Sequence, residues 1–150
     1  MTLEVQFDCT GWSEIISTMM SNCTIENLLK DAGEIFNEDI ASQFWEQGDP
    51  VWLPLSPRRM EERHRNGEGD PAILIESGAL LRSWSEPGGD HIEIIGSDSI
   101  TVGSTLFYAE LQQDGGTNAE QSHVPPRPVR LREEAVSQVA ERIIVHLTGE

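Results

Sequence analysis

Apolar and polar residues alternate at the start of the chain, and this pattern predicts a β-strand. Leu3, Val5 and Phe7 occupy every second position, so an extended segment would place their side chains on one face. Apolar residues then recur at helical spacing over residues 12–20. A short helix is predicted there.

Residues 25–47 form the longest periodic segment and predict an amphipathic helix. The apolar positions recur at intervals of three and four, which gathers them into one stripe. That stripe consists of Ile25, Leu28, Leu29, Ala32, Ile35, Phe36, Ile40, Ala41, Phe44 and Trp45. The opposite side is acidic, with Lys30 as its only cation. It is either a solvated face or an acidic interaction face.

A proline-flanked apolar loop and a basic cluster follow this helix. Trp52, within the loop of residues 51–55, belongs either in the core or at an interface. Ser56 and Pro57 are typical of a helix start. The only basic cluster of the sequence comes next and consists of Arg58, Arg59, Arg63 and Arg65. It is either solvated or docks on an acidic neighbouring subunit, and residues 58–71 are expected to form a mobile loop.

The middle of the chain predicts the end of a helix followed by an antiparallel hairpin. Residues 72–84 are strongly apolar, and Gly78 suits a bend or a close packing point. Residues 92–96 and 100–104 each alternate, with Ile92 and Ile94 expected on one face. Residues 106–111 are expected to form a short helix or turn on the sheet.

The last part of the chain predicts a loop, a rigid strap and a closing helix. Glycines make residues 113–124 a candidate mobile loop, and three prolines keep residues 124–129 extended. The strap should aim Arg127 at a carboxylate, either in this chain or across a subunit boundary. The final helix, residues 133–147, has one apolar side: Ala135, Val136, Val139, Ala140, Ile143, Ile144 and Leu147.

Together these elements predict one α+β domain over residues 1–150: a small antiparallel sheet packed against a long N-terminal helix and a C-terminal helix, with extended loops. The 26 acidic residues outnumber the 10 basic ones, which gives a formal net charge of −16. Because a chain this acidic repels phosphate, stable nucleic-acid binding is not expected. An acidic wall beside a DNA channel remains compatible with this charge. No signal sequence or long apolar run suggests a membrane, so synthesis in a cytoplasm is expected.

No catalytic constellation or cofactor motif stands out, and we expect neither an enzyme nor a cofactor. Cys9 and Cys23 are expected to be free thiols. The Glu61-x-x-His64 spacing is half of a di-iron motif, and its second half is missing. Gly67-Glu68-Gly69 lacks the strand and helix of a dinucleotide site.

Five short motifs occur in an order that resembles one known family. They are Trp52 with Leu55-Ser56, then Ile73-Leu74 with Ser77-Gly78 and Leu80, then Val102-Gly103-Ser104, then Tyr108-Ala109 with Gln112-Gln113 and Gly115-Gly116, then Val124-Pro125 with Arg127-Pro128. In this order they resemble the phage virion morphogenesis (tail completion) family. The family usually has His where Gln112 stands, an aromatic residue at Asp114, and Ala and Phe at Pro126 and Val129.

The resemblance implies a structural virion protein that completes the tail of a tailed phage and joins it to the head connector. Its expected partners are further copies of itself in a ring, a hexamer by analogy with tail tubes, together with connector, adaptor, tail-tube or terminator proteins. It would lie in the neck or upper tail of the virion, after assembly in the host cytoplasm. The candidate interface residues are Trp52, Arg58, Arg59, Arg63, Arg65, Gln112, Gln113, Arg127 and Arg130. The alternative is an acidic module that mimics DNA or binds a host factor.

Overall fold

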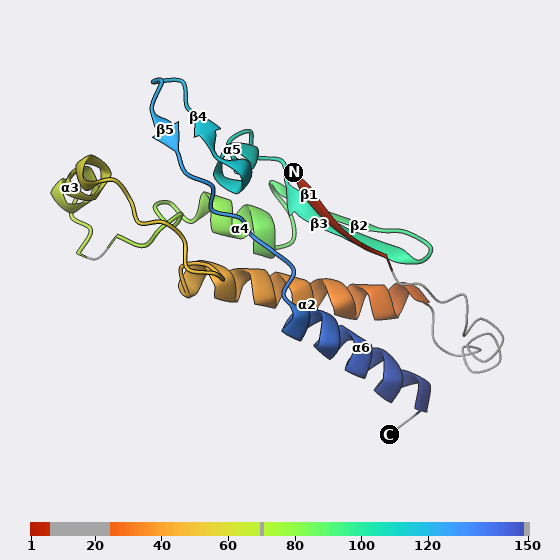
Figure 1. The fold of residues 1–150 in the computed structure, drawn as a ribbon. Coiled ribbons are helices and arrows are strands. Elements are labelled where there is room, and N and C mark those ends of the chain that lie inside the picture. Colours follow the sequence, from red (N-terminus) through yellow and green to blue (C-terminus); the bar gives the residue numbers. More distant parts are fainter. Residues whose placement is uncertain (7–24, 70, 149–150) are drawn as a thin grey trace.

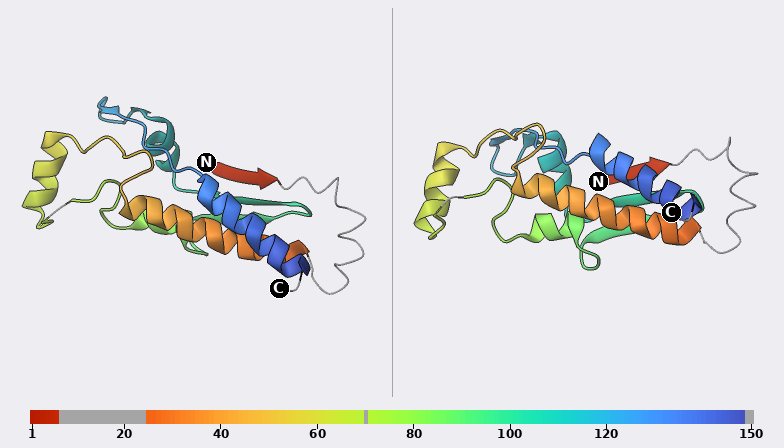
Figure 2. Two further views of the ribbon diagram at one scale, coloured as in Figure 1. Left: turned by 60° about the horizontal axis from the view of Figure 1, so that its bottom comes forward. Right: turned by 90° about the horizontal axis from the view of Figure 1, so that it is seen from below.

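Helix α2 (Ile25–Trp45) lies at the centre of the molecule and organises the other elements around it (Figure 1). The computed structural model describes residues 1–6, 25–69 and 71–148. One flank of α2 packs against the sheet and helix α4 (Ala79–Ser85), and another packs against α6 (Glu133–Thr148), as Figure 2 shows. The predicted α+β class is confirmed. The helix predicted over residues 12–20, Phe7 and both cysteines lie outside the described residues.

The sheet has three antiparallel strands with the C-terminal strand of the predicted hairpin in the middle. Strand β3 (Ser99–Ser104) pairs with β2 (His91–Ile95) on one edge and with β1 (Thr2–Gln6) on the other. Thr2 lies opposite Gly103, and Ile95 lies opposite Ile100. The N-terminal strand and the hairpin were both predicted, whereas the strand order comes from the structure.

The inward face of β2 differs from the prediction. Ile94 is exposed, whereas Ile95 packs against the core and the His91 side chain is buried. Strand pairing decides this, because Ile95 lies opposite the buried Ile100 and must share its face. Isoleucines at 92, 94 and 95 make both faces apolar, so the sequence pattern alone does not select one.

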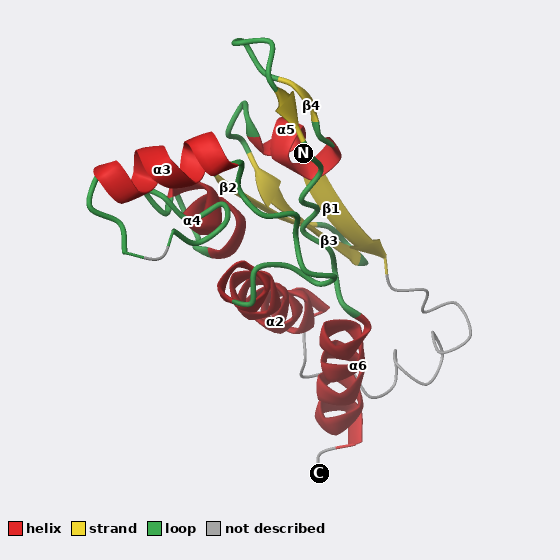
Figure 3. Cartoon of the chain, turned by 60° about the vertical axis from the view of Figure 1, so that its left-hand side comes forward, coloured by secondary structure: helices red, strands yellow, loops and turns green. Residues whose placement is uncertain are grey.

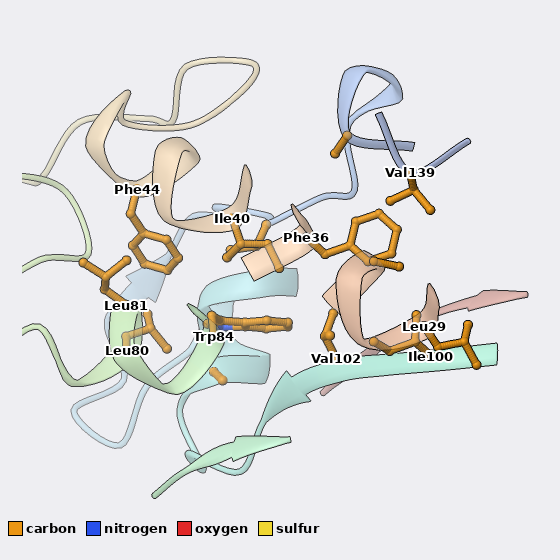
Figure 4. Packing of buried hydrophobic residues seen from close by; sticks show 14 of the residues in the cluster. Leu29, Phe36, Ile40, Phe44, Leu80, Leu81, Trp84, Ile100, Val102 and Val139 are labelled. Atoms are coloured by element: carbon orange, nitrogen blue, oxygen red, sulfur yellow. The ribbon is translucent and has the colours of Figure 1, made fainter. Parts of the chain in front are cut away.

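The core fills the space between α2, α4 and the sheet (Figure 4). Trp84 of α4 is 1% exposed and lies between α2 and the sheet. Val139 of α6 extends the cluster on the far flank of α2, near Phe36. The largest fully buried side chains are Trp84, Phe36, Phe44, Ile40, Ile100, Gln43, Val102, Val139 and Ser104. Because four separate elements supply them, this cluster holds the fold together.

Several predicted boundaries shift. Helix α2 ends at Trp45, and α4 begins at Ala79, after Gly78 with a φ of 74°. Helix α5 (Ala109–Asp114) starts later than the predicted residues 106–111. The stripe predicted on α6 is only partly buried: Ala135 and Val139 are covered, whereas Val136 and Ile144 are exposed.

Both segments expected as mobile loops contain regular structure. Helix α3 (Pro57–Arg65) occupies most of residues 58–71. Strands β4 (Gly116–Thr117) and β5 (His123–Val124) form a two-stranded ribbon within residues 113–124. The extended strap after β5 was predicted and is present. The mobility of either segment stays a prediction.

Gly103 allows β1 to approach β3 closely, and Gly103→Ala tests this packing. An added Cβ would lie 2.5 Å from the Met1 carbonyl oxygen and 3.0 Å from Thr2 Cα. Backbone atoms cannot move aside cheaply, so we expect a loss of about 1–3 kcal/mol in the free energy of unfolding, measured by chemical denaturation. Gly69→Ala is the matched control, since nothing lies within 4 Å of its Cβ position. Equal stability of the two variants would contradict this account of the β1 edge.

Candidate functional site

A cleft of about 450 Å³ opens where three distant segments of the chain meet. The turn after α2, the end of α5 and the strap after β5 form its walls. Its lining residues are Pro50, Val51, Trp52, Leu53, Gln113, Asp114, Pro126, Pro128 and Arg130. Three of the predicted interface residues, Trp52, Gln113 and Arg130, therefore come together here.

Trp52 lines this cleft and is only 4% exposed. Its ring lies edge-on to Phe44, with the ring centroids 5.4 Å apart. The indole Nε1 donates a hydrogen bond of 3.0 Å to the Pro128 carbonyl. One side chain thus packs on α2 and ties the apolar loop to the strap, as a buried tryptophan with a satisfied N–H can do. Of the two predicted placements, the core is the one observed in the isolated chain.

Arg127 binds backbone carbonyls, and the predicted carboxylate partner is wrong for the described part of this chain. Its Nε donates to the Leu53 carbonyl at 2.9 Å, and its Nη2 donates to the Pro54 carbonyl at 3.1 Å. Burial lowers the pKa of Arg127 from its ordinary value. The guanidinium fork fits two successive carbonyls of a proline-rich loop that has no strand partner for them.

Two glutamines hold the strap by hydrogen bonds to its backbone. Gln113 donates to the Val129 carbonyl at 2.8 Å and accepts from the Val129 N–H at 2.9 Å. Gln43 of α2 does the same at Arg130, at 2.6 and 3.0 Å. Each amide replaces a missing strand neighbour. Neighbouring Gln112 takes part through its backbone, because its carbonyl accepts from the Arg127 N–H at 2.7 Å.

Sequence reasoning missed Gln43, although a signal was present. Gln43 continues the apolar row of Phe36 and Ile40 on α2, and it is fully buried. A polar side chain in that row needs a partner inside the fold. That partner is a strap far along the chain, which a local pattern does not reveal.

The rim of the cleft carries exposed apolar side chains and two charged residues. Val51 is 77% exposed and Leu53 is 59% exposed. Asp114 and Arg130 lie exposed beside them. Such a rim around a tethered tryptophan suits a protein contact better than small-molecule chemistry, because exposed apolar patches mark interaction surfaces.

The four arginines of the basic cluster lie on α3, and no residue of α3 lines the cleft. Figure 3 shows α3 at one side of the molecule. Ser56 caps this helix by accepting from the Arg59 N–H at 3.3 Å, and Pro57 stands in its first turn, as predicted. Arg59 pairs with Glu62 and Glu76 at 2.7 and 2.6 Å. We call α3 with its flanking segments, residues 54–56 and 66–69, the basic arm.

Arg63 fixes the base of the basic arm. It is 2% exposed, and its Nε lies 3.0 and 2.9 Å from the two carboxylate oxygens of Glu68. It also donates to the carbonyls of Ala72, at 2.7 Å, and Ile75. Hydrogen bonding to Arg63 lowers the pKa of the Glu68 carboxyl from its ordinary value. The sequence did not distinguish this structural arginine from its neighbours.

The structure thus divides the predicted interface residues into three groups. Arg59, Gln112 and Gln113 are half-buried. Trp52, Arg63 and Arg127 are buried and hold the chain together, so in the isolated chain their side chains offer no surface. Arg58, Arg65 and Arg130 are exposed. An interface role for any of them stays a prediction.

Other kinds of site find no further support. Within residues 1–6, 25–69 and 71–148, no three side chains of the metal-binding types gather as a metal site would require. Every helix across the described ranges is too short or too polar to cross a lipid bilayer. Comparisons with known proteins gave no match to a family model, to a curated protein or to a solved structure.

Proposed function

We propose that this chain is a structural protein of a tailed phage that forms a ring at the neck or tail top and joins the completed tail to the head connector. The resemblance of its motifs to the tail completion family gives the proposal its starting point. One observation carries it further: motifs far apart in the sequence interlock around one cleft. Trp52 binds the strap at Pro128, and Arg127 binds the loop beside Trp52. If this chain shares the fold of that family, its separate motifs should pack together into one structural unit, as they do around this cleft.

The surface of that unit fits a role based on contact. The exposed Val51 and Leu53 at the cleft rim would bury apolar area against a neighbouring protein. A net charge of −16 keeps the free subunit soluble and prevents passing DNA from adhering. Head-to-tail contacts between identical copies close a ring when their rotation permits, and analogy with tail tubes gives six copies.

The proposal is tested by inactivating the gene for this chain in the phage that encodes it. We expect separate heads and tails in electron micrographs, and joining on addition of the purified protein. Leu53→Asp protein should fail to restore joining, because a charge would be desolvated at the cleft rim. Ile94→Asp is the matched control, since Leu53 and Ile94 are both 59% exposed and Ile94 lies on the sheet. Ile94→Asp protein should restore joining.

Joined and infectious particles made without the chain would contradict the proposal. A monomer that binds a host DNA-binding enzyme, with no effect on particle assembly, would instead favour the acidic mimic. Restoration of joining by Leu53→Asp protein would leave the structural role in place and exclude the cleft rim as its contact.

A further inference from the structure

The basic arm presents two exposed arginines, Arg58 and Arg65, that make no direct ion pair among the described residues. Arg59 is the main cause of the lowered pKa of the Glu62 carboxyl, and the charges of Arg58 and Arg65 lower it further. Arg58 and Arg65 are both exposed, whereas Arg59 and Arg63 are paired with glutamates. Arg65 follows Arg58 at an interval of seven positions, so the two exposed arginines lie on one face of α3, about 10 Å apart along its axis. The arm projects from the body of the molecule (Figures 1 and 3).

The basic arm is held in place by hydrogen bonds within the chain before any partner binds. The buried Arg63 clamps its base through Glu68 and two carbonyls, which holds α3 away from the α2 helix of the same chain. A preformed arm loses little conformational entropy when it binds. Its charge is also opposite to that of the chain as a whole, since α3 carries four arginines against two glutamates while the net charge is −16.

The outward face of α2 carries acidic residues at the same seven-position interval as Arg58 and Arg65 on α3. Asp31, Glu38 and Trp45 follow one another at intervals of seven residues, and Glu34 lies between the first two. None of these acids has an ion-pair partner among the described residues. Trp45 is 67% exposed, which is unusual for so large an aromatic side chain. Arginine binds carboxylates and also stacks on tryptophan, and exposed tryptophans are frequent anchors of protein interfaces.

We propose that α3 of one copy lies across the outward face of α2 of a second copy, so that Arg58 and Arg65 meet the acidic row and Trp45. The inference rests on the proposed assembly of identical copies and names the contact that makes it. Charge complementarity identifies the occupant as a second copy, because the same chain supplies both the basic arm and the acidic face. The two surfaces differ, so the contact is head-to-tail and repeats around a ring.

Charge reversal tests this contact, with assembly of the full chain followed by light scattering and sedimentation velocity. Arg58→Glu with Arg65→Glu, and separately Glu34→Lys with Glu38→Lys, should each raise the dissociation constant by about tenfold or more. An equimolar mixture of the two variants should assemble again, because each reversed surface then meets its complement. A chain with all four substitutions should assemble within about threefold of the wild type.

The α2 variant gives the sharpest control. Lysines at 34 and 38 reduce the overall repulsion between acidic copies, so a nonspecific charge effect would strengthen assembly. Glu134→Lys with Glu141→Lys makes the same change in net charge on exposed positions of α6, and it should not weaken assembly. If the substitutions on α2 weaken assembly and those on α6 do not, the loss is due to the proposed contact and not to the change in net charge.

Two results would overturn the inference in distinguishable ways. If the wild type assembles and the reversed variants do so equally well, or their mixture fails to recover, this contact is excluded and the proposed function stands. If the wild type remains a monomer at every concentration tested, the contact is excluded as a cause of assembly in solution, and the joining experiment on particles decides the proposed function separately.

Discussion

Replacing Trp52 with alanine is expected to lower the free energy of unfolding by about 3–5 kcal/mol. The substitution removes a side chain that is 4% exposed, its edge-on contact with Phe44 and its hydrogen bond to the Pro128 carbonyl. A loss of this size is a large fraction of the total stability of a domain. Chemical denaturation followed by circular dichroism measures it.

Trp45→Ala is the matched control, because Trp45 is the last residue of α2, close to Trp52 in the sequence, and is 67% exposed. Removal of its side chain should change the stability of the monomer by less than about 0.5 kcal/mol. If Trp52→Ala cost no more than Trp45→Ala, Trp52 would not be the structural link between loop and strap, and the account of the cleft would be wrong.

Replacing Arg127 with alanine is expected to lower the free energy of unfolding by about 2–4 kcal/mol. The carbonyls of Leu53 and Pro54 would lose their donor, and the strap would lose its fixed position against the loop. Arg127→Lys keeps the charge but lacks the fork that reaches two carbonyls at once, so it should recover only part of the loss. Thermal and chemical denaturation both measure these differences.

Arg130→Ala provides the comparison within the same strap. Its side chain is exposed, and its backbone bonds to Gln43 do not depend on it. We expect a change of less than about 0.5 kcal/mol. Similar losses for Arg127→Ala and Arg130→Ala would show that charge on the strap matters and that the carbonyl contacts of Arg127 do not.

Local periodicity was enough to predict the main elements of the fold. The spacing of Leu29, Phe36 and Phe44 predicted a long helix whose buried stripe is observed. Alternation around Ile100 and Val102 predicted the central strand. These patterns are reliable because each buried face repeats with the period of its own backbone. The helix start at Ser56 was likewise predicted from local backbone preferences, whereas the start of α4 after Gly78 was not.

The contacts that build the candidate site were harder to predict, because they join residues far apart in the sequence. Gln43 and Trp52 donate hydrogen bonds to the carbonyls of Arg130 and Pro128, which lie far along the chain. The place of Gln43 in the apolar row of α2 signals that it is buried, but the local pattern does not identify its partner. Arg127 was expected to point from the strap at a carboxylate, but its partners are carbonyls, because the strap crosses the loop at Leu53.

The ribbon of β4 and β5 and the exposed side of α6 show a second kind of limit. Gly115 and Gly116 indicate a turn, and two-residue strands such as Gly116–Thr117 are too short to show alternation. On α6, Val136 and Ile144 belong to a periodic stripe, yet they are exposed because α2 covers only one side of it. Periodicity predicts which residues share a face, whereas burial also depends on the width of the neighbouring element.

Electron microscopy of intact phage particles, labelled with an antibody against this chain, tests the central proposal most directly. The account predicts label at the joint between head and tail, and as many copies of the chain in each particle as one closed ring contains. Purified infectious particles that carry no label and contain none of the chain by mass spectrometry would contradict it.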